Sequence, residues 1–519
     1  MRLKAALLAA AFALAPMAMS APAMAQPKTA LSVGIAAQDI GRLDPHFAVT
    51  TIDRVVVAWM YNGLVRFKPG SINPAEIEPD LAERWESSAD GKTWTFHLRR
   101  GVKWHGDFGE VTADDVVFSL KKAAQPSTSA FSADFRAFET VEAVDPYTVR
   151  IVLKENVPSL LGLVTNYSGG FIISKKAYEQ RGDSFVRNPI GSGPFAFGSV
   201  TPNQSLELVA HEGYFRGAPQ IKKISYRFIP SDASRDLAYQ NGELDLNYGR
   251  ADQTWVNRTR QVPNTVVDVF EPGELATISF NTLQKPFDDI RVRRAVSMAI
   301  NRPELVRWRG ADVSRESQSL VPRGYLGFTA DNGLLPNDIN RAKALLAEAG
   351  YPNGLTIKMI HTQLPEMLSA IQVVQAQLRR AGINLDLQVV EHATFHQQIR
   401  QDLSPMVYYA AARFPVADIY LTQFWHSRSA VKTGASPVTN FSHCNVADAE
   451  IDAARVETDK DKQLALWATA QRKLIENACG VPLIETLLVF ARRSNLDYGY
   501  ELKGSMSLGP LITEQTRFR

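Results

Sequence analysis

Strand and helix patterns alternate between residues 355 and 392, and this order restricts the possible folds more than any other feature of the chain. "LTIKMI" (355–360) has the pattern of a strand, "EMLSAIQVVQAQLRRAG" (366–382) that of a long helix, and "INLDLQVVEH" (383–392) that of a second strand. A helix between two strands is the usual connection of parallel strands. The sequence therefore predicts an α/β fold with a largely parallel sheet in the second half.

Local signals place further helices and strands around this alternation. "TWTFHL" (93–98) alternates between two faces, as a half-buried strand does. Thr112 and Asp115 form a capping box, which predicts that a helix starts there. The stretch 290–300 predicts a helix with an apolar stripe, and a second helix is expected to start at Asn301.

The first residues predict export from the cytoplasm. Arg2 and Lys4 precede an apolar run at 5–15, which has the length of a signal-peptide core and is shorter than the ~20 residues of a membrane span. Small residues then offer a cleavage site after Ala25. We therefore expect a signal peptide over 1–25 and a mature protein in a Gram-negative-type periplasm.

Charge, length and cysteine content bound the class of protein. Without Arg2 and Lys4 the formal charge of +3 falls to about +1, so neither nucleic acid nor a membrane surface is expected as a partner. The remaining chain of about 490 residues predicts two or three domains. Cys444 and Cys479 are the only cysteines, and either a disulfide or two buried free thiols would fit the sequence.

Seven motifs occur in the order and spacing of one protein family. The longest, "EPDLAERWESSADGKTWTFHLRRGVKWHGDFGEVTADDVVFSL", covers residues 78–120. The others are "LDPH" at 43, "YNGLVRF" at 61, "NPIGSGPF" at 188, "FNTLQKPFDDIRVRRAVSMAINR" at 280, "AKALLAEAGYPNG" at 342 and "VPLIE" at 481. With these motifs, nearly all of the mature chain resembles the extracellular solute-binding proteins of peptide, nickel and opine ABC importers, known as family 5.

This resemblance implies a type II periplasmic-binding-protein fold, with two α/β lobes, a hinge and a small inserted domain. Carried onto this chain, it places lobe I at 26–72, 188–281 and 492–519, the inserted domain at 73–187, and lobe III at 282–491. It also implies capture of a small solute between the lobes and delivery to ABC permease subunits, with the ATPase on another chain. Closure would select the state that the permease recognises, and a monomer suffices for this mechanism.

The sequence lacks the motifs of the common catalytic sites. It has no G-x-S-x-G elbow and no H-E-x-x-H helix, and Glu86 stands where a phosphate loop ending at "GKT" (91–93) would need glycine. His392 and His396 are four residues apart and could share a metal on a helix, but the stretch begins as a strand and offers no third ligand beyond Glu391. We expect a binding protein without a cofactor or a resident metal, and not an enzyme.

Arg413 ends an apolar stretch, "YYAAARF" at 408–414, where a guanidinium is unexpected. In peptide-binding relatives the matching segment typically supplies an aspartate that pairs with the free amine of the peptide. An arginine inverts this charge and needs an anionic partner in a cleft. We expect a ligand with a carboxylate or phosphate, such as an opine, an acidic sugar derivative, a modified peptide or a metal chelate. The alternatives are that Arg413 pairs with a protein acid such as Asp418, or that the register of the match is shifted.

Six further residues are candidates for contacts with the ligand. Three aromatic side chains near Arg413 could stack on a planar or sugar-like ligand face, or lie in the core. Two residues after "LDPH" match the loop through which the first lobe of the family touches ligand, and an asparagine lies at the expected hinge. In this order, the candidates are Tyr408, Tyr409, Trp425, Val49, Thr50 and Asn281.

The same fold would also serve a different function. The chain could be a periplasmic sensor that presents its closed form to a receptor, or a carrier of a metal complex or haem. These functions differ from import in the partner and not in the fold.

Overall fold

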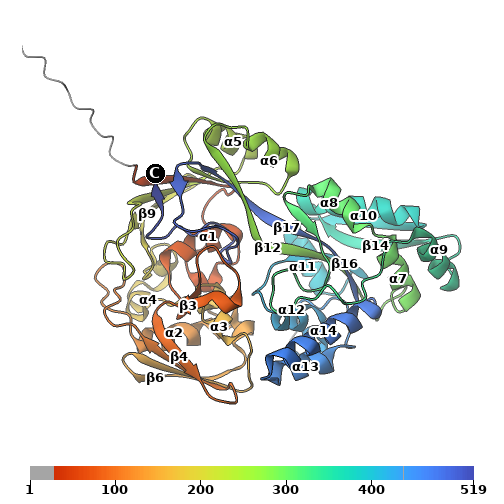
Figure 1. Cartoon of the computed structure of the whole chain (residues 1–519), viewed down its shortest axis with the longest axis horizontal. Helices are drawn as coiled ribbons and strands as arrows, with labels where there is room; N and C mark the ends of the chain where they lie inside the picture. Colours follow the sequence, from red (N-terminus) through yellow and green to blue (C-terminus); the bar gives the residue numbers. More distant parts are fainter. Residues whose placement is uncertain (1–27, 436–437) are drawn as a thin grey trace, which may run out of the picture.

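The computed structural model describes residues 28–435 and 438–519, so the expected signal peptide lies outside the described residues. Figure 1 shows two bodies, with the residues coloured red to yellow on one side and most residues coloured green to blue on the other. The long strands β12 (Thr265–Phe280) and β17 (Gly480–Arg493) run between them, and the C-terminus lies on the N-terminal side. We call these parts the N-terminal body (28–270 and 490–519) and the C-terminal body (275–486).

A nine-stranded mixed sheet forms the framework of both bodies. β1 pairs in parallel with β10 and β11, and the other pairs are antiparallel. Besides β12 and β17, its strands are β1 (Ala30–Ile35), β8 (Phe195–Thr201), β9 (Ser205–Ala210), β10 (Lys223–Phe228), β11 (Leu246–Tyr248), β13 (Ser314–Glu316) and β16 (Met406–Ala411). β1 lies inside the sheet, between β11 and β10. Its residues from Leu31 to Ile35 are therefore almost all buried on both faces.

The pairing partners of β12 and β17 change where the chain passes between the bodies. On the N-terminal side β17 pairs with β11, and on the C-terminal side β12 pairs with β16 from Leu275 onward. The register between β12 and β17 shifts between Phe270 and Glu274, at this change of partners. The two strands thus pass from one body to the other near 271–274 and 487–489. The lobe boundaries expected at 281 and 491 stay a prediction.

The smaller sheets confirm the β-α-β prediction only for one pair of strands. β14 (Leu355–Thr362) and β15 (Ile383–Val390) are parallel and joined by α10 (Pro365–Arg380). The wider expectation of a largely parallel sheet in the second half is wrong, because β12, β13, β16 and β17 pair antiparallel. These strands are far apart in sequence, so local patterns give no information on their direction.

Three further sheets complete the described structure. One has four strands, in the order β4 (Ala82–Ser87), β5 (Thr93–Leu98), β7 (Thr148–Leu153) and β6 (Phe138–Asp145). The other two have two strands each, β2 (Val65–Phe67) with β3 (Ile77–Pro79) and β18 (Leu496–Asp497) with β19 (Arg517–Phe518).

Helices begin where the capping residues predict. Asp115 accepts a hydrogen bond from the backbone N–H of Thr112 at 3.0 Å and opens α2 (Ala113–Ala123), and the Asn301 side chain caps α8 (Arg302–Arg309). The other α-helices are α1 (Thr51–Met60), α3 (Leu160–Leu163), α4 (Lys175–Arg181), α5 (Asp232–Gln240), α6 (Gln253–Thr259), α7 (Ile290–Ala299), α9 (Ile339–Glu348), α11 (His392–Arg400), α12 (Ala417–Trp425), α13 (Asp448–Val456) and α14 (Lys460–Glu476). Short 3-10 turns are η1 (Pro45–Phe47), η2 (Pro74–Glu76), η3 (Ser132–Phe135), η4 (Ser168–Gly170), η5 (Gly182–Val186) and η6 (Ser427–Ser429). None of the helices in the described ranges combines the length and the apolar character that a membrane crossing requires.

Each body has its own hydrophobic core, and a further cluster lies partly between them. The N-terminal core includes both the first strands and the segment expected as an inserted domain, whereas a separate core fills the C-terminal body. The further cluster joins Phe67 of the N-terminal body to Phe414 and Trp467. It also holds Cys444 and Cys479, whose Cα atoms are 6.0 Å apart. Of the two alternatives that the sequence allowed, the structure has the disulfide.

Candidate functional site

A cavity of about 500 Å³ lies where the two bodies face each other. The N-terminal body lines it from α1, η3, α3 and η4, and the C-terminal body lines it from α11, β16 and α12. A ligand held there contacts both bodies only when they are together. The polar side chains of the lining are Arg54, Asp134, Tyr167, Ser168, His396, Arg400, Tyr409, Arg413 and Gln423.

The two bodies touch each other around this cavity. The rings of Phe67 and Phe414 pack with their centroids 5.6 Å apart. The Asn156 amide donates a hydrogen bond to the backbone oxygen of Arg455 at 3.2 Å. Neither residue belongs to the strands that join the bodies, and neither lines the cavity. The arrangement is therefore closed, with protein contacts that exist only while the bodies are together.

Arg413 lies in the lining directly after β16 and has no acidic partner. Its Nε donates to the Gln423 side-chain oxygen at 2.8 Å, its Nη1 donates to the backbone oxygen of Ala412 at 3.0 Å, and the guanidinium lies over the Phe424 ring. In the part of the chain that the structure describes, no carboxylate oxygen lies within 4.0 Å of Arg413. Asp418, the alternative partner, instead faces Arg455 at 3.4 Å. Arg413 therefore keeps donors for a ligand.

The cavity has an excess of positive charge. Arg54, Arg400 and Arg413 line it together with one carboxylate, that of Asp134. Burial, the neighbouring His392 and Arg400 lower the pKa of His396 to about 4, so this imidazole is neutral at neutral pH. Three guanidiniums and one carboxylate leave the lining with a net charge of +2, and this charge favours an anionic solute.

His392 and His396 contact each other at the edge of the cavity. Their Nε2 atoms are 3.2 Å apart, and Nδ1 of His392 lies 3.0 Å from the Thr362 hydroxyl. The strand expected over 383–392 is two residues too long, because β15 ends at Val390. Glu391 then caps α11, which places both histidines on one helical face. The described residues contain no group of three or more metal-ligating side chains that could hold an ion.

The structure places the seven candidate residues of the sequence in different surroundings. Val49, Tyr409 and Arg413 lie in the lining. Thr50 is exposed and caps α1, where its hydroxyl accepts from the backbone N–H of Asp53. The remaining three are buried outside the lining: Tyr408 packs in the C-terminal core, Trp425 packs in the cluster with the disulfide, and Asn281 donates to Asp402 at 2.9 Å. All seven stay predictions as ligand contacts.

Sequence reasoning missed the other charged residues of the cavity. Arg54 follows the helix cap Thr50 by about one helical turn, which is a signal that it points to the same side as the Val49 loop. Asp134 lies in a short turn without any periodic pattern, and its neighbour in the cavity, Gln423, is 289 residues away in sequence. No local signal could have joined these two residues.

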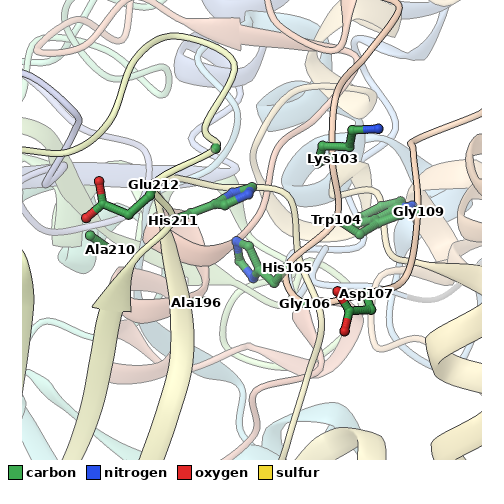
Figure 2. Close-up of a pocket in the computed structure, with 11 residues that line it drawn as sticks. Lys103, Trp104, His105, Gly106, Asp107, Gly109, Ala196, Ala210, His211 and Glu212 are labelled. Atoms are coloured by element: carbon green, nitrogen blue, oxygen red, sulfur yellow. The ribbon is translucent and has the colours of Figure 1, made fainter.

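A larger hollow of about 700 Å³ lies elsewhere, between the loop at 103–109 and the strands β8 and β9. Figure 2 shows the rings of His105 and His211 facing each other in it, while Glu212 points away from them. Both walls belong to the N-terminal core, so closure of the two bodies cannot bury a ligand there. We therefore place the functional site in the smaller cavity between the bodies.

Two bodies that are joined by two strands and close on a shared cavity define a two-lobed binding protein. The sequence model of the bacterial extracellular solute-binding proteins, family 5 (middle part), matches residues 76–432. This chain belongs to that family.

Similar proteins agree with this assignment. The dipeptide-binding protein of Escherichia coli K12 is 30% identical, over 81% of this chain and 82% of that protein. Among solved structures, the binding protein MoaA of A. tumefaciens R10 in complex with mannopinic acid is 54% identical, with a TM-score of 0.85 over 95% of this chain and 100% of that one. The binding protein DppA of Helicobacter pylori in complex with the peptide STSA is 26% identical, with a TM-score of 0.80 over 95% of this chain and 98% of that one.

The expectation from the sequence is confirmed at the level of the class. The protein is the solute-binding component of an ABC importer, with a type II periplasmic-binding-protein fold, and its relatives are binding proteins rather than enzymes. The family binds a small solute and delivers it to an ABC permease.

Proposed function

We propose that this protein captures a carboxylate-bearing solute of the opine type and delivers it to its permease. The observation that carries the proposal is Arg413, a guanidinium in the cavity without an acidic partner among the described residues. A carboxylate would accept two N–H bonds from such a group, whereas a free amine would be repelled. The excess of positive charge in the lining supports the same ligand class.

The similar structures support an opine rather than a peptide. MoaA, which is 54% identical to this chain, was solved with mannopinic acid, whereas the peptide complex of DppA is 26% identical. In the register expected from the sequence, Arg413 stands where peptide-binding relatives carry the aspartate that holds the peptide amine. We therefore propose that ordinary peptides are poor ligands.

The proposal includes the place and the state of the protein. We propose that the signal peptide is cleaved after Ala25 and that the mature chain works as a monomer in the periplasm, without a catalytic reaction on its solute. A monomer suffices because both walls of the cavity come from one chain.

A binding titration tests the ligand class. We expect mannopinic acid to raise the melting temperature of the ligand-free protein and unblocked dipeptides such as Ala-Ala to leave it unchanged, since a ligand stabilises in proportion to occupancy. Arg413→Gln should lower the affinity for the acid about 10- to 100-fold, because hydrogen bonds to charged groups contribute about 1.5–3 kcal/mol. Arg413→Lys should fall between, because it loses the bidentate geometry.

Arg341→Gln is the matched control, because Arg341 is exposed and far from the cavity lining. It should bind the acid like the wild type. The largest stabilisation by dipeptides, together with an unchanged affinity in Arg413→Gln, would contradict the proposal.

A further inference from the structure

The Phe414 side chain crosses the boundary between the two bodies. It follows Arg413 directly after β16 of the C-terminal body, yet its ring packs against the N-terminal body, with its centroid 5.6 Å from that of Phe67. The ring also reaches Gly162 of α3, and both of these residues line the cavity. Phe414 is 6% exposed in this closed arrangement. Separation of the bodies would take its ring out of these contacts and into water.

Gly162 leaves the space that the Phe414 ring occupies. A Cβ atom added at Gly162 would lie well inside van der Waals contact with this ring, and its three nearest atoms would be Cζ, Cε1 and Cε2 of Phe414. Gly162 lies in a helical turn and is not among the glycines with a positive φ. Its backbone would therefore accept alanine, which favours helices. Only the approach of a ring from the other body excludes a side chain at this position.

Phe414 and Arg413 belong to one fixed segment of the C-terminal body. The Tyr325 hydroxyl accepts from the backbone N–H of Arg413 at 3.3 Å and donates to the backbone oxygen of Arg413 at 2.7 Å. The backbone oxygen of Phe414 accepts from the N–H of Val416 at 2.7 Å. Tyr325 is itself buried in the cluster that contains Phe414. The ring and the guanidinium therefore move together when the bodies open or close.

We propose that Phe414 and Gly162 form a closure seat: the bodies reach the closed arrangement only when the Phe414 ring lies on the bare backbone of Gly162. Because the ring is fixed to Arg413, the same step brings the guanidinium to the solute. Phe414 and Gly162 are thus positioning residues, and burial of the ring contributes to closing. The seat depends on shape alone, so this inference goes beyond the proposed ligand class and holds for a solute of any chemistry.

The competing role for this pair is static packing of the fold, and a measure of closing that needs no ligand separates the two roles. The side-chain tips of Glu155 and Arg428, on opposite bodies, lie 3.9 Å apart. With cysteine at both positions in the mature chain, the rate of cross-linking by a short bismaleimide reports the population of the closed arrangement. The native Cys444 and Cys479 do not compete, because they form a disulfide.

Gly162→Ala in this background adds one methyl group under the ring. It should slow cross-linking about tenfold or more, because overpacking of a close contact disfavours the closed arrangement. The dissociation constant for mannopinic acid should rise by the same factor, since the solute binds the closed population. The melting temperature without ligand should stay within a few degrees of the wild type, because the N-terminal body accepts the alanine.

Phe414→Leu supplies the rescue, because leucine lacks the three ring atoms that the added methyl group would meet. We expect the double variant Gly162→Ala, Phe414→Leu to cross-link within about threefold of Phe414→Leu alone. Gly213→Ala is the matched control. Gly213 is exposed and without a positive φ, and an added Cβ would meet nothing closer than 3.4 Å, so its cross-linking rate should equal that of the parent.

The outcomes are distinct. Cross-linking of Gly162→Ala at the parent rate would overturn the closure seat. A slow rate that Phe414→Leu does not restore, or a melting temperature of Gly162→Ala many degrees below the wild type, would overturn it in favour of static packing. A parent protein that cross-links but does not bind mannopinic acid would contradict the proposed ligand class and leave the closure seat standing.

Discussion

At the scale of single residues, His105 shows how burial sets a charge state. Its Nε2 donates to the backbone oxygen of Gly193 at 2.9 Å, and its Nδ1 accepts from the backbone N–H of Gly191 at 3.3 Å. Burial lowers the pKa of this imidazole to about 3, against 6.5 for an ordinary histidine. The neutral ring satisfies both backbone groups, whereas a second proton would remove the acceptor and leave a charge in the core.

This environment predicts a pH dependence of stability. Between pH 6.5 and about 3 the unfolded chain binds the His105 proton and the folded chain does not, so the free energy of unfolding falls as the pH falls. From pH 7.5 to pH 5 we expect His105 to account for a loss of about 2 kcal/mol. Urea unfolding of His105→Gln at both pH values should show a loss smaller by this amount. If the free energies of unfolding of His105→Gln and the wild type changed equally with pH, His105 would bind its proton equally in the folded and the unfolded chain.

Residue-level prediction from the sequence succeeded where the interaction is local. The capping box of Thr112 and Asp115 lies within four residues, so its pattern is visible in the chain itself. The surroundings of Arg413 were accessible only through the resemblance to a family. Asp134 was not predictable at all, because its environment combines Arg54 of its own body with Gln423 and Arg413 of the other body, all distant from it in sequence.

At the scale of elements, local patterns identified the strands and helices but not their partners. β14, α10 and β15 lie where their patterns predict, and their parallel pairing follows from the helix between them. β12 and β17 connect the two bodies, yet their paired residues are far apart in sequence: Ser279 pairs with Gly480, 201 positions later. Such pairing depends on the whole chain, so the direction of these strands was predicted wrongly.

The disulfide predicts how the elements at the start of β17 respond to reduction. Cys444 precedes α13 and Cys479 precedes β17, with 35 residues of separation. Closing a loop of this length restricts the unfolded chain and stabilises the fold by about 3–4 kcal/mol in the chain-entropy estimate. The double variant Cys444→Ser, Cys479→Ser should lower the free energy of unfolding in urea by this order, and dithiothreitol should produce a similar loss in the wild type only. Equal stability of wild type and double variant under oxidising conditions would contradict the expectation.

At the scale of the whole molecule, function depends on the balance between open and closed arrangements. A solute that binds between the bodies shifts this balance only through its preference for the closed arrangement. Contacts such as that of Asn156 with Arg455 add to the stability of the closed arrangement without touching the cavity. Affinity for the solute is thus a property of both the cavity and these remote contacts.

Asn156→Ala tests this link between remote contacts and affinity. Removing one hydrogen bond of about 1 kcal/mol that exists only in the closed arrangement should raise the dissociation constant for mannopinic acid about fivefold. Titration calorimetry measures the affinity, and thermal unfolding without ligand should stay near that of the wild type. Asn384→Ala, an exposed asparagine on β15 whose side chain bonds only within the C-terminal body, is the matched control and should bind like the wild type. X-ray scattering with saturating acid should show the compact form for all three proteins, because excess solute offsets the lost contact. If Asn156→Ala binds the acid as tightly as the wild type, the contact does not contribute to closure and the affinity resides in the cavity alone.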